Sequence, residues 1–172
     1  MMPIRIKIAS IDNVLALQAI SKTTFLEAFA KSNTEADMAL YLHEQLSVDQ
    51  LRTELENPNS AFYFASINDQ VIGYLKINFS GAQTEIQSDE ALEIERIYVL
   101  QQFQDQQIGT MLLQKAMQRA QELQATYVWL GVWEHNKKAI GFYQKHGFVA
   151  FDQHIFKLGN DEQTDILMKI AI

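Results

Sequence analysis

The sequence contains no cysteine, only two prolines and seven glycines among its 172 residues. Without cysteine the chain can form no disulfide, use no thiolate nucleophile and build no cysteine-based zinc site. Cations are also outnumbered, because 14 Lys and Arg face 21 Asp and Glu, a net charge of −7. This balance argues against a nucleic-acid partner, since an electrostatic binder needs a basic face to neutralise phosphates.

Long apolar runs are absent as well. No stretch approaches the roughly 18 apolar residues of a membrane span, and residues 1–10 lack the apolar region of a secretory signal. We therefore expect a cytoplasmic protein without a membrane partner. The chain shows no linker, low-complexity run or internal repeat, and its length suits one domain over residues 1–172.

Apolar periodicity predicts the order of the elements as β, helices, β-hairpin, β, α, β, α, β-hairpin. The expected strands are 4–8, 61–67, 71–78, 91–99, 126–133, 148–158 and 164–170. The expected helices are 11–30, 107–123 and 136–146, with two more that begin after capping boxes at Thr34 and Ser47. Strands outnumber crossover helices, so a doubly wound sheet does not fit. We expect an α/β (α+β) protein with a mixed, mostly antiparallel sheet of about seven strands and helices on both faces.

The first motif lies where a strand ending at Val99 leads through a polar connection into a helix near Gly109. Free N–H groups and the helix dipole at such a turn favour a phosphate group. The segment is neither a Walker A motif nor G-x-G-x-x-G. By itself, a single glycine before an amphipathic helix is more often a packing residue.

A second motif follows downstream, with the spacing Asn-x-x-Ala-x-x-x-Tyr-x-x-x-Gly-Phe at Asn136, Ala139, Tyr143, Gly147 and Phe148. The two motifs together resemble the GNAT superfamily of N-acetyltransferases, whose first motif is matched at Val99, Gln104 and Gly109. Segments 129–134 and 161–165 further resemble the PaiA-type branch, described as polyamine N-acetyltransferases. The sequence departs from the family at Gln107, where glycine is usual.

The resemblance implies the GNAT fold and acetyl-CoA as cofactor. The pyrophosphate of CoA would lie on backbone N–H groups of residues 104–110, and its pantetheine arm beside strand 97–99, in a cleft where two strands splay apart. Gln107 can supply its N–H if its φ is negative. The implied cofactor-binding residues are Ile97, Tyr98, Val99, Gln104, Asp105, Gln106, Gln107, Ile108, Gly109, Thr110, Asn136 and Tyr143.

Tyr143 is the candidate general acid. A phenol with a pKa of about 10 is protonated at neutral pH and can supply a proton to departing CoA thiolate. The residues alone also allow a core role for Tyr143 beside Phe142 and Phe148. Asn136 suits a helix N-cap, a contact to pantetheine, or both.

Glu93 and Glu95 are the candidate bases, since an amine with a pKa of about 10 must lose a proton before it attacks. Strand alternation predicts that they share one face with Ile97 and Val99, while Leu92, Ile94 and Arg96 take the other. Glu95 is slightly favoured, and a solvated strand face is the alternative. The four histidines lack a metal-ligand spacing, so we predict no metal site; they are His43, His135, His146 and His154.

These observations predict an enzyme that transfers acetyl from acetyl-CoA to a primary amine by direct attack in a ternary complex. A polyamine such as spermidine or spermine is the expected small-molecule acceptor. The alternatives are a protein or peptide N-acetyltransferase and a CoA-binding regulatory module without turnover. A homodimer is compatible with each of these readings.

Overall fold

The computed structural model describes residues 3–172. Its strands form one seven-stranded sheet in the order β1-β2-β3-β4-β5-β7-β6. Neighbouring strands run antiparallel except for β4 and β5, which are parallel. The strands are β1 (Arg5–Ile8), β2 (Ser60–Ile67), β3 (Gln70–Phe79), β4 (Ala91–Val99), β5 (Tyr127–Trp133), β6 (Val149–Leu158) and β7 (Asp161–Ala171).

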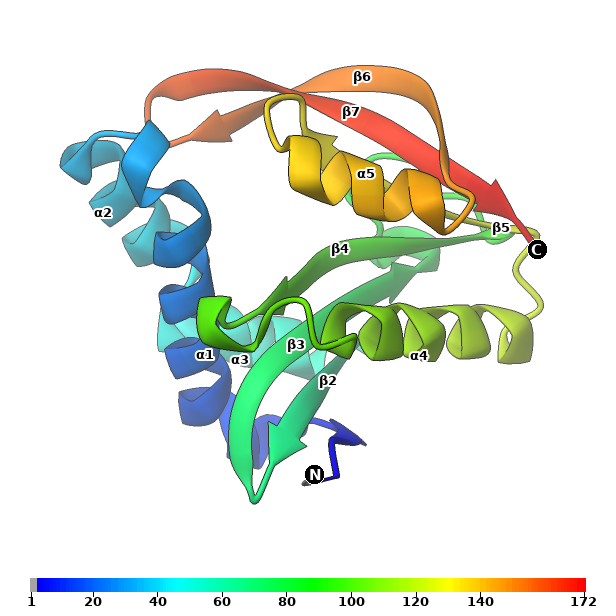
Figure 1. The fold of residues 1–172 in the computed structure, drawn as a ribbon, viewed down its shortest axis with the longest axis horizontal. Helices are drawn as coiled ribbons and strands as arrows, with labels where there is room; N and C mark the ends of the chain where they lie inside the picture. Colours follow the sequence, from blue (N-terminus) through cyan, green and yellow to red (C-terminus); the bar gives the residue numbers. More distant parts are fainter. Residues whose placement is uncertain (1–2) are drawn as a thin grey trace.

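Helices cover both faces of this sheet (Figure 1). They are α1 (Val14–Phe29), α2 (Glu35–Gln45), α3 (Val48–Glu56), α4 (Ile108–Glu122) and α5 (Lys137–Lys145). Apolar residues of α4 and α5 form one core with the sheet, and those of α1, α2 and α3 form a second core on the opposite face. The arrangement confirms the predicted fold class, a mixed and mostly antiparallel sheet with helices on both faces.

Local signals in the sequence place most element boundaries. The hydroxyls of Thr34 and Ser47 each accept a hydrogen bond of 3.1 Å from the backbone N–H three residues later, which starts α2 and α3. Gly147 (φ 95°) and Gly159 (φ 64°) adopt the left-handed conformation at the predicted turns. The last strand begins at Asp161 rather than at residue 164, so the final hairpin has a tighter turn than predicted.

The predicted faces of β4 are wrong beyond Glu95, because the strand contains a β-bulge. Arg96 pairs with Lys76 and Ile94 with Ile77, which leaves Glu95 as an extra residue. A bulge shifts the alternation of side chains by one position. Ile97 and Val99 therefore pack with Leu92 and Ile94 in the α4–α5 core, while Arg96 joins Glu95 and Tyr98 packs in the opposite core.

The parallel strands β4 and β5 part before either of them ends. Their pairing runs from Ala91↔Tyr127 to Ile94↔Leu130, although β4 continues to Val99 and β5 to Trp133. Beyond this point β4 pairs only with β3 and β5 only with β7, and the edges of β4 and β5 that face each other open into a cleft. The β6–β7 hairpin closes one side of this opening, because the N–H of Asn160 donates to Asp37 Oδ1 on α2 at 2.9 Å.

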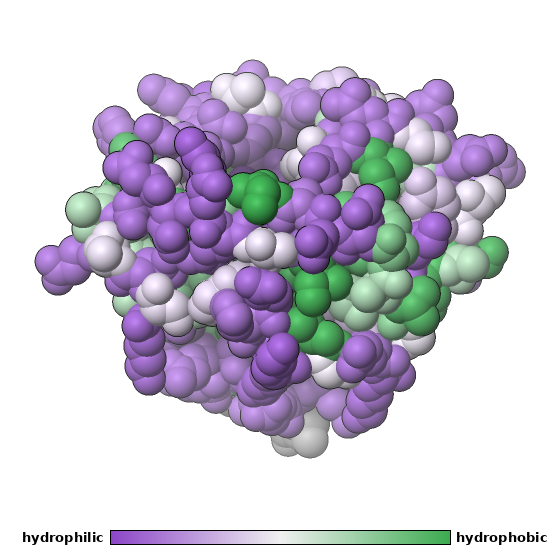
Figure 2. Space-filling model, turned by 90° about the horizontal axis from the view of Figure 1, so that it is seen from above, coloured by the Kyte–Doolittle hydropathy of each residue, from purple (hydrophilic) through white to green (hydrophobic). Residues whose placement is uncertain are grey.

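The face seen from above is mostly hydrophilic, with apolar residues gathered right of centre and otherwise scattered (Figure 2). The large apolar side chains therefore lie mainly in the cores and the cleft. Among residues 3–172, no helix combines the length and the hydropathy needed to cross a membrane.

Candidate active site

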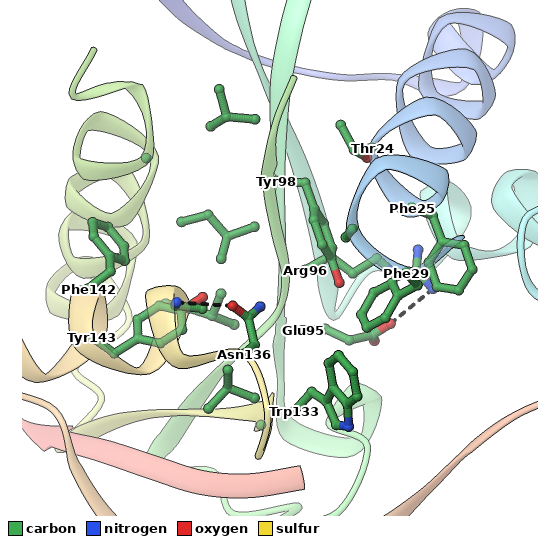
Figure 3. Close-up of a pocket in the computed structure, with 18 of the residues that line it drawn as sticks. Thr24, Phe25, Phe29, Glu95, Arg96, Tyr98, Trp133, Asn136, Phe142 and Tyr143 are labelled. Atoms are coloured by element: carbon green, nitrogen blue, oxygen red, sulfur yellow. Dashed lines mark hydrogen bonds and ion pairs between the residues drawn. The ribbon is translucent and has the colours of Figure 1, made fainter. Parts of the chain in front are cut away.

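A cleft of about 1370 Å³ opens where β4 and β5 part. Figure 3 shows side chains from helices on both faces of the sheet and from β5 pointing into it: Tyr143 and Phe142 from α5, Phe25 and Phe29 from α1, and Trp133 from β5. The half of the cleft between α4 and α5 contains the predicted cofactor residues and is called the cofactor half. The other half of the cleft, called the acceptor half, lies between α1 and the β6–β7 hairpin.

The turn before α4 has a backbone shaped to hold an anion. Asp105 (φ 64°) and Gln107 (φ 65°) are both left-handed, and α4 begins directly after Gln107. A turn of this kind gathers backbone N–H groups into a concave surface at the positive end of the helix dipole. The residues present therefore fit the pyrophosphate of CoA.

The condition of a negative φ at Gln107 is not met. Gln107 takes the left-handed conformation that glycine adopts without strain, because the chain must turn at this position to enter α4. A side chain in that conformation costs about 1–2 kcal/mol. The shape of the turn is thus retained without glycine, at a cost in backbone strain.

The predicted cofactor residues line the cleft with the exception of Gln106. The side chain of Gln104 donates to the carbonyl of Val99 at 3.2 Å, and Lys138 Nζ lies 3.1 Å from Gln104 Oε1. Asn136 caps α5, because its Oδ1 accepts from the N–H of Ala139 at 3.1 Å. The two sequence motifs therefore face each other across the cofactor half of the cleft.

Tyr143 combines burial with access to the cleft. Its ring packs edge-on against Phe142 and Phe148, with ring centroids 5.3 and 5.7 Å away, yet the residue lines the cleft. Burial raises the pKa of the Tyr143 phenol. The hydroxyl is therefore protonated at neutral pH, so that packing and proton donation are compatible roles.

Aromatic rings form the walls of the acceptor half. Phe25 stacks on Tyr41 with 4.1 Å between ring centroids, and Tyr41 lies 6.2 Å from Phe156 of the β6–β7 hairpin. Phe25 also lies 4.8 Å from Phe29, which in turn lies 6.0 Å from Trp133 of β5. Such walls suit methylene segments and, through their ring faces, ammonium groups.

Glu95 belongs to a buried network of four charges. Lys76 Nζ lies 2.7 Å from Glu54 Oε1 and 2.8 Å from Glu95 Oε1, and the Arg96 guanidinium lies 3.0 Å from an oxygen of each glutamate. Burial opposes ionisation of Glu95, but Arg96, Lys76 and the amide of Asn78 lower its pKa to about 2. The Glu95 carboxylate is thus held by Lys76, Arg96 and the amide of Asn78, and it is a weak acceptor for a proton.

Glu93 lies on the same face as Glu95, as predicted, and the two share the amide of Asn78, at 2.9 and 2.8 Å. Only 3% of Glu93 is exposed, and its carboxylate also accepts hydrogen bonds from the N–H and hydroxyl of Thr84. Burial raises the pKa of Glu93, an effect that these hydrogen bonds oppose.

Three further polar side chains come together in the acceptor half, and the sequence analysis predicted no role for any of them, although Asp165 lies in the segment 161–165. They are Glu85 from the loop before β4, His154 from β6 and Asp165 from β7. Alternation along β7 could have placed Asp165 on the face of Leu167, but not its partners. Among the residues that the structure describes, no group of His, Asp and Glu side chains could hold a metal ion.

Comparison with known proteins agrees with this geometry. The profile of the acetyltransferase (GNAT) family matches residues 23–148. An uncharacterized N-acetyltransferase of Lactobacillus delbrueckii subsp. lactis is 42% identical over 154 residues, which cover 90% of this chain and 89% of that protein. An N-alpha-acetyltransferase of Sulfurisphaera tokodaii is 31% identical over 114 residues, 62% of this chain and 68% of that protein.

Solved structures share the fold at low sequence identity. The PaiA N-acetyltransferase of Thermoplasma acidophilum, in complex with coenzyme A, superposes with a TM-score of 0.82 at 20% identity and covers 99% of this chain and 100% of that one. A ribosomal-protein-alanine N-acetyltransferase from Brucella melitensis gives a TM-score of 0.75 at 20% identity, with 98% and 99% covered.

Proposed function

The chain belongs to the GNAT family of N-acetyltransferases and uses acetyl-CoA, and we propose that its acceptor is the primary amine of a polyamine such as spermidine. The observation that carries this proposal is the charge of the acceptor half. Glu85, Glu93 and Asp165 line it, and within residues 3–172 none of the three pairs with a lysine or arginine. Aromatic walls beside unbalanced carboxylates suit a flexible chain of methylenes that carries several positive charges.

The same arrangement assigns roles to the residues of the cofactor half. Residues 104–110 would hold the pyrophosphate on their N–H groups, and the backbone at Ile97 and Val99 would pair with the pantetheine arm. Acetyl-CoA supplies the acetyl group as an activated thioester. Tyr143 would donate its proton to the sulfur that departs, and Asn136 would fix the start of α5 beneath the bound arm.

The two glutamates predicted as bases differ in what they can do. Glu95, with a pKa of about 2, is better suited to hold Lys76 and Arg96 in place than to remove a proton. Glu93, whose pKa burial raises, is the stronger base of the pair. Their shared contact with Asn78 keeps both carboxylates on the acceptor face.

An acceptor panel tests the proposal. Release of CoA thiol is measured with spermidine, with butylamine and with a short peptide that has a free N-terminus. We expect kcat/KM for spermidine to exceed both others by at least about tenfold, or about 1.4 kcal/mol, and its KM to rise with salt. Equal use of butylamine refutes the polyamine assignment, and preferred use of the peptide supports the peptide alternative. If none of the amines is acetylated, a regulatory CoA-binding module without turnover is supported.

The role of Tyr143 is tested separately. Tyr143→Phe should lower kcat by about 10²- to 10⁴-fold, with CoA affinity in calorimetry little changed. Tyr127→Phe, at the far end of β5, is the matched control and should be nearly neutral. A loss of less than about threefold in Tyr143→Phe would show that the ring serves packing alone.

A further inference from the structure

The amine substrate must lose a proton before it attacks, and a candidate base lies on β7, near the point where β4 and β5 part. Pairing between β4 and β5 stops at Ile94↔Leu130, so Gly131 is the first residue of β5 beyond the point of parting. Because Gly131 has no side chain, the backbone there is open. A Cβ at this position would lie 3.4 Å from Asp165 Oδ2 on the neighbouring strand β7. The Asp165 carboxylate therefore lies over the open backbone where the two strands separate.

Asp165 is linked to solvent through two titratable side chains. His154 is the register partner of Asp165 on β6, and its Nε2 lies 3.5 Å from Asp165 Oδ2. Its other ring nitrogen, Nδ1, contacts Glu85 Oε2 of the loop before β4. Side-chain exposure rises along this series from 16% at Asp165 through 22% at His154 to 42% at Glu85. The series leads from the interior of the cleft to its rim.

We propose that Asp165 accepts the proton of the acceptor ammonium and that His154 and Glu85 pass it to solvent. The proposal rests on an amine acceptor but not on a polyamine. One N–H bond of the ammonium breaks, its electron pair stays on nitrogen, and the proton moves to Asp165 Oδ2. The neutral amine forms the N–C bond as the C–S bond breaks, and the sulfur takes the proton of Tyr143. The nitrogen then returns a second proton to Tyr143, while its third remains on the amide.

The surroundings of Asp165 favour this role over Glu95, and Asp165 is more accessible than Glu93, which is 3% exposed and accepts hydrogen bonds from Asn78 and Thr84. Burial raises the pKa of the Asp165 carboxyl, His154 lowers it, and Glu85 raises it again, with a net upward shift. Glu95, in contrast, has a pKa of about 2. A carboxylate with the higher pKa is the better proton acceptor at neutral pH.

The charged groups that face Asp165 come from a small number of elements. His154 faces it from β6 and Glu85 from the loop before β4. On this face the strand β5, which separates β4 from β7, presents Tyr127, Trp129, Gly131 and Trp133, and its one titratable group, Tyr127, lies at the end of the strand away from Asp165. Glu93 is the next carboxylate, on β4, where it is held by Asn78 and Thr84. The acidic limb of the pH–rate profile should therefore follow Asp165 together with its His154–Glu85 partners.

The test compares Asp165→Asn with wild-type enzyme on two kinds of amine. The first is whichever protonated primary amine the wild-type enzyme acetylates, and the second is 2,2,2-trifluoroethylamine, which is already neutral at neutral pH. We expect kcat for the protonated amine to fall by about 10²-fold at pH 7, and the loss to shrink as the pH approaches the pKa of the amine. For the neutral amine the loss should stay below about threefold. Asp152→Asn, an exposed carboxylate on β6, is the matched control and should behave as wild type.

Two further measurements separate a proton acceptor from a structural or binding residue. In the cofactor-free protein, the carboxyl carbon shift of Asp165, assigned with the Asp165→Asn variant, should titrate above the usual range of aspartate. His154→Gln should move the acidic limb of the pH–rate profile more than it lowers the maximal rate. CoA affinity and thermal unfolding of Asp165→Asn should match wild type.

Several outcomes would overturn the inference. Equal losses for both amines at every pH would make Asp165 structural, and an increase in KM alone would make it a binding residue. A titration at or below the usual aspartate range would contradict the upward shift of the Asp165 pKa and with it the role as proton acceptor. If spermidine is not used but another amine is, the polyamine proposal fails and the comparison proceeds with that amine. If no amine is acetylated, both the polyamine proposal and the role of Asp165 are overturned.

Discussion

Removal of Lys76 should destabilise the protein far more than removal of a surface lysine. Lys76 is 6% exposed and contacts Glu54 and Glu95 at 2.7 and 2.8 Å. Its register partner on β4 is Arg96, so that two cations lie directly opposite each other and are held there by the two carboxylates. The group has no net charge because its two cations balance its two carboxylates, so removal of any one of the four leaves an unbalanced charge.

Lys76→Met leaves two buried carboxylates with one cation. Breaking a buried ion pair from one side costs about 3–5 kcal/mol, because the remaining charge is desolvated without compensation. For a domain of this size each kcal/mol corresponds to about 2–4 °C, so the Tm should fall by about 6–20 °C. The double variant Lys76→Met/Glu54→Leu restores neutrality and should recover at least about half of the lost free energy.

Urea unfolding followed by circular dichroism measures the free energies of unfolding of the wild type and both variants. Lys7→Met, at an exposed position of β1, is the matched control and should change stability by less than about 0.5 kcal/mol. A cost below about 1 kcal/mol for Lys76→Met would mean that the network is hydrated like surface pairs. A double variant no more stable than Lys76→Met would refute the argument from charge balance.

Three further predictions follow from particular residues. The pKa of Glu95 is lowered from 4.5 to about 2 in the folded protein, so its contribution to stability is fully present above pH 4.5 and is lost as the pH falls through about 2. Urea unfolding over this pH range should show that the wild type loses roughly 3 kcal/mol more free energy of unfolding than Glu95→Gln. Gln107→Gly relieves a positive φ of 65°, so stability should rise by up to about 1 kcal/mol and CoA affinity in calorimetry should be equal or better; a large loss of affinity would show that the Gln107 side chain contacts the cofactor. Gly159→Ala would place a Cβ 2.6 Å from the Asp37 Cα at a φ of +64°, so urea unfolding should show a loss of about 1–3 kcal/mol, and an unchanged stability would contradict the close packing of the hairpin on α2.

Local patterns in the sequence were sufficient for the order of the elements and for the two segments, around residues 97–110 and 136–143, that line the cleft between α4 and α5. The turn into α4 and the cap at Asn136 were predictable because helix starts depend on neighbours within about one turn of chain. The face of Glu93 and Glu95 followed from strand alternation in the same way. Each of these features is decided by residues close together along the chain.

The bulge at Glu95 was the first feature that only the tertiary structure decided. Bulging depends on how β3 pairs with β4, and it reversed the predicted faces of Arg96, Ile97 and Val99. The same pairing brings Lys76 to Glu95 and turns the favoured base into a buried counter-ion. Strand pairing joins residues far apart in sequence, so no local pattern contains this information.

The series of contacts from Asp165 through His154 to Glu85 was the second feature that only the tertiary structure decided. His154 and Glu85 lie 69 residues apart, and they meet Asp165 only because β6 and β7 form the hairpin beside the loop that precedes β4. Local patterns therefore determined which chemistry this chain performs, since each motif is built from one short segment. The fold decided which carboxylates are neutralised and which remain able to take a proton, since burial and ion pairing depend on the side chains that long-range packing brings around each group.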